Sequence, residues 1–179
     1  MTEAQKNNEL MRNLIAAFPE NLTQALEIAT NYPLTKSYPT FNNVVICGMG
    51  GSGIGGKLVA SWIADEMTIP INFCQDYTLP NYVNNKTLII ASSNSGNTEE
   101  TISAVEEAHK KGASIVGICS GGKLEVLCKQ WNYDCIILPG GHPPRTQLAF
   151  SIIQLVHIFA EINLINKEKL NEFVSAGEL

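Results

Sequence analysis

The chain has 179 residues, of which 45% are hydrophobic and 16% charged, and its formal net charge is -5. This composition is typical of a folded globular protein and excludes a disordered or fibrous chain, and the length favours one domain. Since 17 acidic residues oppose 12 basic ones and no basic run is present, we do not expect a nucleic-acid partner.

The first 43 residues are predicted to form a helical extension followed by a connector. Residues 3–18 and 19–29 place apolar side chains near helical spacing. Residues 32–43 contain two prolines, and this density of breakers predicts an irregular segment. We expect both helices to pack against the main domain.

From residue 44 onward, short apolar runs alternate with helical patterns, which is typical of parallel βαβ units. Each run is too short and too apolar for a half-exposed antiparallel strand. The predicted fold is α/β, with a five-stranded parallel doubly wound sheet covered by helices on both faces. Its strands span residues 44–48, 69–74, 87–91, 114–119 and 135–138, and its connecting helices span residues 55–66, 97–111 and 123–131.

A final helix is predicted over residues 146–165, after two prolines. It carries an apolar stripe formed by Leu148, Ile152, Leu155, Val156 and Phe159. We expect this stripe to be exposed and to dock on an apolar surface. The chain is therefore expected to form a homo-oligomer, such as a dimer, or to pair with a second domain.

The segment after the first predicted strand has six glycines in nine positions, over residues 48–56. Glycines let backbone N–H groups approach an anionic ligand closely. Gly48, Gly50 and Gly53 also fit the dinucleotide-binding pattern G-x-G-x-x-G, and Asp76 follows the second strand. A dinucleotide site, and a tight turn with no ligand, remain alternatives to a phosphate site here.

The segment after the third predicted strand carries the sharper signal. Ser93, Ser95 and Thr98 can each donate a hydroxyl hydrogen bond, and a helix that starts near Asn97 offers unpaired N–H groups. Gly96 permits a close backbone turn between them. An ordinary helix cap is the alternative, but a cap needs only one such side chain. Three hydroxyls around a glycine favour a phosphate cradle, and a second anion site beside the first favours a compact phosphorylated ligand over a dinucleotide.

Arg145 is the third candidate element, because it follows the fifth strand directly after two prolines. A guanidinium whose approach is fixed in this way can stabilise an oxyanion. The alternative is a surface arginine in a salt bridge. We interpret His142, beside glycine and proline, as a solvated turn residue, and His109 and His157 as structural residues of helices.

These motifs resemble the sugar isomerase (SIS) domain superfamily, and within it the bifunctional phosphoglucose/phosphomannose isomerases. The resemblance rests on residues 50–53 and 93–101 and extends over about residues 44–165. It implies a SIS fold with flavodoxin-like strand order, a bound phosphorylated hexose, and an arginine near the enediolate, which makes Arg145 the catalytic candidate. The sequence departs from the family pattern at residues 146–150. The predicted substrate-binding residues are Gly50, Gly51, Ser52, Ser93, Ser95, Gly96, Asn97 and Thr98.

In the resembling family, the catalytic base is a glutamate from the second half of a longer chain. We therefore expect residues 44–165 to be the first SIS domain of a two-domain aldose-ketose isomerase, with residues 166–179 as the start of a linker. Alone, the chain is expected to bind glucose, mannose or fructose 6-phosphate and to isomerise poorly or not at all. A phosphosugar-sensing module without catalysis is the alternative. No metal or other cofactor is expected.

The location of the protein is predicted from what its sequence lacks. No apolar stretch approaches the roughly 20 residues of a membrane-spanning helix, and the polar start has no signal-peptide core. We expect a cytoplasmic protein with no membrane partner. Buried reduced thiols are the favoured interpretation of the five cysteines, which are Cys47, Cys74, Cys119, Cys128 and Cys135.

Overall fold

The computed structural model describes residues 2–177 and contains one five-stranded sheet. All strand pairs are parallel, and the strand order is β2-β1-β3-β4-β5. This order confirms the predicted doubly wound fold. The chain direction across the sheet reverses between β1 and β3, where open sheets of this type bind ligands. The strands are β1 (Asn43–Cys47), β2 (Ile71–Cys74), β3 (Thr87–Ser93), β4 (Ser114–Cys119) and β5 (Asp134–Ile137).

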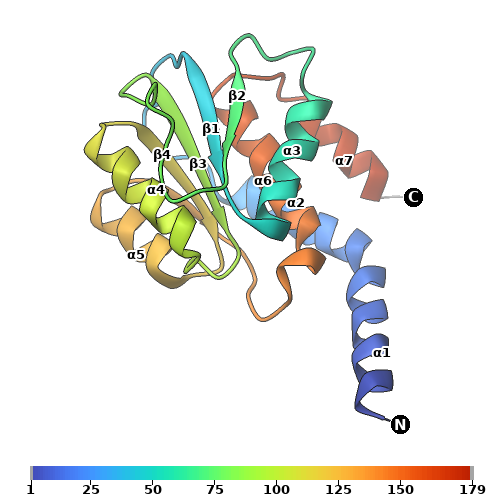
Figure 1. Ribbon diagram of the computed structural model, residues 1–179. Helices are drawn as coiled ribbons and strands as arrows, with labels where there is room; N and C mark the ends of the chain where they lie inside the picture. The colour runs from blue at the N-terminus through green and yellow to red at the C-terminus, as the bar shows by residue number, and fades with distance from the viewer. Residues whose placement is uncertain (1, 178–179) are drawn as a thin grey trace.

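Helices cover both faces of the sheet, as predicted (Figure 1). One face packs against α4 and α5, and the opposite face packs against α2, α3 and α6. Successive strand residues point to opposite faces, so Val44 and Val45 belong to different cores. These helices are α2 (Phe18–Asn31), α3 (Gly50–Trp62), α4 (Glu99–Lys110), α5 (Gly122–Gln130) and α6 (Leu148–Glu161).

The last predicted helix is buried, so the expectation that its apolar stripe is exposed was wrong. Leu155, Val156 and Phe159 of α6 have no exposed surface. They lie in the core that α6 shares with α2 and α3. A further helix, α7 (Lys169–Gly177), packs on α2 and α6 within the segment that we expected to begin a linker. An apolar stripe predicts that a helix face is covered, but it does not specify which element covers it.

The two N-terminal helices behave differently. α2 packs on α6 and buries Leu22, Ala25 and Ala29. α1 (Glu3–Ala16) projects away from the body of the molecule and buries no residue (Figure 1). A capping box between Thr2 and Gln5 defines its start. Packing of the N-terminal helices against the main domain is thus confirmed for α2 and wrong for α1.

The connector before β1 is held to the far edge of the sheet by one buried carboxylate. Asp134, at the start of β5, is 4% exposed. It accepts hydrogen bonds from the Thr35 N–H at 3.1 Å, the Thr35 hydroxyl at 2.7 Å, the Lys36 N–H at 3.1 Å and the Tyr38 hydroxyl at 2.7 Å. Burial by itself would raise the pKa of Asp134, but these hydrogen bonds lower it below the usual value.

All five thiols are free and buried, which confirms their structural interpretation. The Cys119 and Cys135 sulfurs lie 3.5 Å apart between β4 and β5. A hydrogen bond with Cys74, together with burial, raises the pKa of Cys47, so this thiol stays protonated beside the glycine-rich segment.

The two helical histidines also have structural roles, as predicted. His109 stacks on Trp131 with ring centroids 4.0 Å apart, and its Nδ1 lies 3.0 Å from the Tyr133 hydroxyl. His157 Nε2 lies 3.0 Å from the carbonyl oxygen of Tyr32. The His109 ring therefore connects α4 to the segment that follows α5, and the His157 ring connects α6 to the end of α2.

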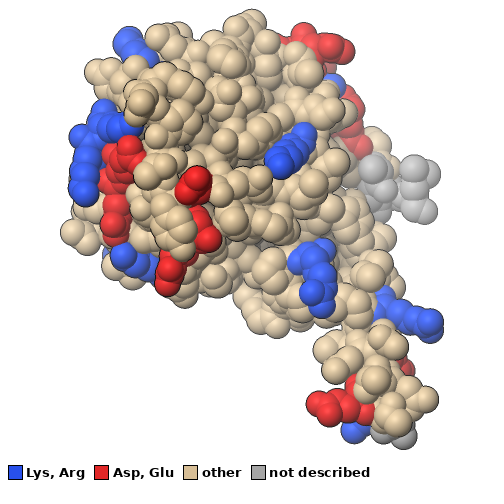
Figure 2. All heavy atoms as spheres, in the orientation of Figure 1, with Lys and Arg blue, Asp and Glu red and all other residues tan. Residues whose placement is uncertain are grey.

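Acidic and basic side chains are interspersed on the face of the molecule shown in Figure 2, without a broad basic surface. This arrangement agrees with the absence of basic runs from the sequence. Within residues 2–177, none of the helices has the length and apolar character that crossing a membrane would require.

Candidate functional site

The loops that follow β1, β3, β4 and β5 meet around Asn94, at the carboxyl edge of the sheet. The Asn94 N–H donates to the Ser52 hydroxyl at 3.2 Å, and its side-chain Nδ2 donates to the His142 carbonyl at 3.2 Å. The Asn94 carbonyl accepts from the Ser120 N–H at 2.9 Å and from the Ser120 hydroxyl at 2.6 Å. Asn94 therefore connects all four loops. Asn94 and Ser120 are not among the residues predicted from the sequence, because neither can be distinguished there from an ordinary loop residue.

The glycine-rich segment after β1 is mostly helix rather than loop. α3 starts at Gly50, five residues before the predicted start at residue 55. A Cβ on Gly55 would lie 2.5 Å from Ser151 Oγ, and one on Gly56 would lie 3.0 Å from the Ile46 side chain. These glycines let α3 pack closely on α6 and β1. Gly55 and Gly56 therefore serve packing. The candidates for ligand binding in this segment are its first residues, from Gly50 to Ser52.

The N-terminus of α3 is partly covered by the loop that follows β5. A Cβ on Gly51 would lie 3.0 Å from the carbonyl carbon of Pro144 and 3.2 Å from the Arg145 nitrogen. Gly50, by contrast, has a φ of +51° and open space around it. In dinucleotide-binding folds the pyrophosphate occupies this helix end. Because Pro144 already lies there, the geometry weighs against the dinucleotide alternative.

Ser93 and Thr98 come together at the start of α4. Ser93 is the last residue of β3 and is buried, and its hydroxyl oxygen lies 2.8 Å from that of Thr98. Thr98 occupies the N-cap position of α4, yet its side chain makes no capping hydrogen bond. The ordinary-cap alternative is therefore not supported, and the N–H groups of the first turn have no capping side chain to bind. Two hydroxyls next to a positive helix end have the donor capacity and the electrostatic potential that an anion requires.

The residues between this pair give the loop its shape. Gly96 has a φ of +66°, and a Cβ there would lie only 1.7 Å from the Gly121 carbonyl oxygen. The Asn97 side chain accepts from the Lys123 N–H at 2.9 Å and donates to the Ser95 carbonyl at 3.2 Å. The Ser95 hydroxyl accepts from the Asn97 N–H at 3.2 Å. The polar groups of Ser95 and Asn97 thus form hydrogen bonds with other residues of the loops. Direct contact of Ser95 and Asn97 with a ligand stays a prediction.

Arg145 lies at the rim of the same edge, in a single 3₁₀ turn (Pro144–Thr146). The residue is exposed, and its guanidinium forms no ion pair within residues 2–177. The salt-bridge alternative is therefore not supported. Glu99 and Glu100 lie in the first turn of α4, and Glu99 Oε2 accepts from the Tyr77 hydroxyl at 3.3 Å.

Three buried oxygens near this edge have no hydrogen-bond partner in the described chain: Asn94 Oδ1, Thr101 Oγ1 and Gln147 Oε1. Thr101 follows Thr98 in the first turn of α4, and Gln147 directly precedes α6. Buried polar atoms are nearly always paired in folded proteins. These oxygens can therefore accept hydrogen bonds from donors outside the described chain. A single sequence carries no signal for these positions, because unpaired burial is a property of the three-dimensional packing.

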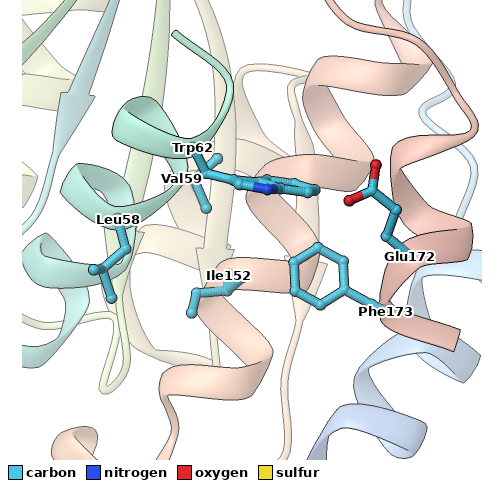
Figure 3. A pocket seen from close by; sticks show the side chains of 6 residues that line it. All are labelled: Leu58, Val59, Trp62, Ile152, Glu172 and Phe173. Atoms are coloured by element: carbon cyan, nitrogen blue, oxygen red, sulfur yellow. The ribbon is translucent and has the colours of Figure 1, made fainter. Parts of the chain in front are cut away.

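A larger pocket of about 440 Å³ lies away from this edge, between α3, α6 and α7 (Figure 3). Its walls are almost entirely apolar, so it lacks the donors that a phosphate group needs. Trp62 and Phe173 lie side by side in its wall in an edge-to-face contact, with ring centroids 5.1 Å apart. The pocket is lined by Leu58, Val59, Trp62, Ile152, Glu172 and Phe173.

Comparison with known proteins points to one family. The model of the SIS domain matches residues 41–156. A bifunctional phosphoglucose/phosphomannose isomerase from Caldicellulosiruptor bescii is 44% identical over 147 residues, which are 82% of this chain and 43% of that protein. The same-named protein from Thermoplasma acidophilum is 43% identical over 120 residues, 67% of this chain and 36% of its own length. The chain spans less than half the length of these relatives.

Solved structures agree on the fold. The C-terminal domain of glucosamine-fructose-6-phosphate aminotransferase from Francisella tularensis superimposes with a TM-score of 0.70 at 16% identity, covering 94% of this chain and 52% of that one. Tagatose-6-phosphate ketose/aldose isomerase from Escherichia coli gives a TM-score of 0.56 at 18% identity, covering 92% and 47%.

Proposed function

Because this chain belongs to the SIS domain family, we propose that it binds the phosphate of a phosphorylated hexose between β3 and α4. The observation that carries the proposal is the pair of hydroxyls, on Ser93 and Thr98, beside a helix N-terminus that no side chain of residues 2–177 caps. A phosphate dianion accepts hydrogen bonds only, and this arrangement offers hydroxyl and backbone donors with the positive end of a helix dipole. The first turn of α3, from Gly50 to Ser52, would line the same pocket.

For the whole protein we propose aldose-ketose isomerisation, between glucose or mannose 6-phosphate and fructose 6-phosphate. The names of the relatives support this substrate class. Arg145 is the proposed catalytic residue of this chain, since a guanidinium can stabilise the enediolate oxyanion while a proton moves between C1 and C2. Residues 44–165 would form the first SIS domain of a two-domain arrangement, and the base would come from outside this chain.

Replacing Thr98 with valine is expected to weaken the binding of glucose 6-phosphate by about 10-fold or more, because a hydrogen bond to a charged group is lost. Isothermal titration calorimetry of the purified chain measures the change. Thr30→Val is the matched control, since the Thr30 hydroxyl on α2 donates to the Leu26 carbonyl, far from the site. Equal affinities of Thr98→Val and wild type would exclude the proposed cradle. Binding of NAD with higher affinity than any hexose phosphate would favour the dinucleotide alternative.

We also propose that the chain associates, either as a homodimer or with a second SIS domain, through the outer face of α3. Ile54, Leu58 and Trp62 recur at four-residue spacing on this face and are 47%, 46% and 37% exposed. They continue into the apolar pocket beside Phe173 (Figure 3). A contiguous apolar stripe of this kind is typical of an interface. We place the protein in the cytoplasm, where five free thiols stay reduced.

Leu58→Glu is expected to shift the chain towards monomer, because a carboxylate in an apolar interface is costly to bury. Sedimentation velocity over a range of concentrations measures this shift. Val126→Glu on α5 provides the control, since Val126 is 60% exposed on the other face of the sheet. A wild-type mass that equals one chain at every concentration would contradict association.

A further inference from the structure

Beneath the site lies a small cavity of about 10 Å³, between the loops that follow β1, β3 and β5. A cavity of this size holds one water molecule. Two of the three unpaired buried oxygens belong to residues that line it, Asn94 and Gln147. Ser52 lines it as well.

The orientation of the Asn94 amide is set by its neighbours. Its Nδ2 donates to the His142 carbonyl at 3.2 Å, so Oδ1 is the atom left without a donor. Ser52 Oγ accepts from the Asn94 N–H at 3.2 Å, and its own proton reaches no acceptor within residues 2–177. The residues that line the cavity therefore carry two unpaired acceptors and one hydroxyl that can donate. This set matches the hydrogen-bonding capacity of a water molecule, which donates twice and accepts.

We propose that one ordered water occupies this cavity, donates to Asn94 Oδ1 and Gln147 Oε1, and accepts from the Ser52 hydroxyl. The water links Asn94, which connects the four loops, to the residue that stands two positions after Arg145. Gln147 is then a positioning residue, because it fixes the segment that carries Arg145 against the loop that carries Ser93 and Thr98. The consequence for ligand affinity rests on the proposed function, whereas the water site does not.

The water site is tested directly by a crystal structure of the chain at a resolution where ordered waters are visible. We expect one water within hydrogen-bond distance of both Asn94 Oδ1 and Gln147 Oε1. In solution, a long-lived water should give cross-relaxation to the side-chain amide protons of Asn94. If neither experiment detects this water, the inference is wrong, whatever the protein binds.

Gln147→Met is expected to remove the water and to weaken the binding of glucose 6-phosphate by about 3- to 10-fold, the effect of one lost hydrogen bond. Gln154→Met is the matched control. Gln154 also has an unpaired buried Oε1, but its Nε2 donates to the Ala25 carbonyl of α2, away from the site. This variant should lose stability and keep the wild-type affinity and the water.

These measurements distinguish the inference about the water and Gln147 from the proposed binding of a hexose phosphate. Unchanged affinity and an unchanged water in Gln147→Met would overturn the role of Gln147. Equal weakening of binding in both glutamine variants would show a general effect of stability and would also overturn it. If the wild-type chain binds no hexose phosphate, the proposed function fails, while the presence or absence of the water still decides this inference.

Discussion

Replacing Gly96 with alanine is expected to destabilise the fold by about 3 kcal/mol or more and to abolish phosphosugar binding. The left-handed conformation of Gly96, with a φ of +66°, costs an L-residue about 1 kcal/mol. The larger part of the lost stability comes from a steric clash with the Gly121 carbonyl oxygen, which would lie 1.7 Å from the new Cβ. Either this oxygen or the loop that carries Ser93 and Thr98 has to move.

Urea denaturation of Gly96→Ala and Gly112→Ala separates the cost of the left-handed backbone from the cost of the steric clash. Gly112 has a φ of +72°, but a Cβ there would meet only the Asn85 side chain, at 3.8 Å. Gly112→Ala should therefore show the backbone cost alone, about 1 kcal/mol. If the two variants lose the same stability, the close approach between the loops after β3 and β4 is not a constraint.

Asp134→Ala is expected to lower the free energy of unfolding by about 3 kcal/mol, because a buried carboxylate that accepts several hydrogen bonds is removed. Thr35, Lys36 and Tyr38 would lose their acceptor, and the connector before β1 would no longer be held to β5. Asp76→Asn is the control, since the carboxylate of exposed Asp76 accepts a hydrogen bond from the Tyr77 N–H next to it. A loss for Asp134→Ala no larger than that of Asp76→Asn would contradict this role.

The same carboxylate gives the protein a specific pH dependence. Because the pKa of Asp134 is lower in the folded chain than the value of about 3.9 in an unfolded one, its contribution is fully present above that value. It is lost as the pH falls through the folded pKa. Between pH 5 and pH 2, Asp134→Asn should therefore lose less stability than wild type in chemical denaturation.

The parallel sheet could be predicted from the sequence because each strand is a short apolar run that ends in turn residues. The predicted strand boundaries agree with the structure to within two residues: β4 matches at both ends, whereas β3 continues two residues further, through Ser93. The start of α3 was misplaced for a physical reason. Residues 50–54 were assigned to a loop because glycine has a low helix propensity. In the structure they form the first turn of α3, where Gly51 lies close to Pro144 and Gly53 close to the Gly48 carbonyl.

The candidate site could be predicted in part. Ser93 and Thr98 were selected because hydroxyls cluster around a glycine, and the structure brings their side chains together. Asn94, Asp134 and Gln147 were not selected, since their roles depend on partners 26 to 99 residues away or on burial. One sequence specifies local spacing well, but contacts between distant loops only appear in the folded chain.

The central claim is that the loops at the carboxyl edge of the sheet bind a hexose phosphate. Chemical-shift mapping of the ¹⁵N-labelled chain during titration with glucose 6-phosphate tests it most directly. We expect saturable shifts in the backbone amides of residues 93–101 and 50–52, with Leu58 and Phe173 unaffected. Shifts confined to the apolar pocket of α3 and α7, or no saturable shift with any hexose phosphate, would contradict the account.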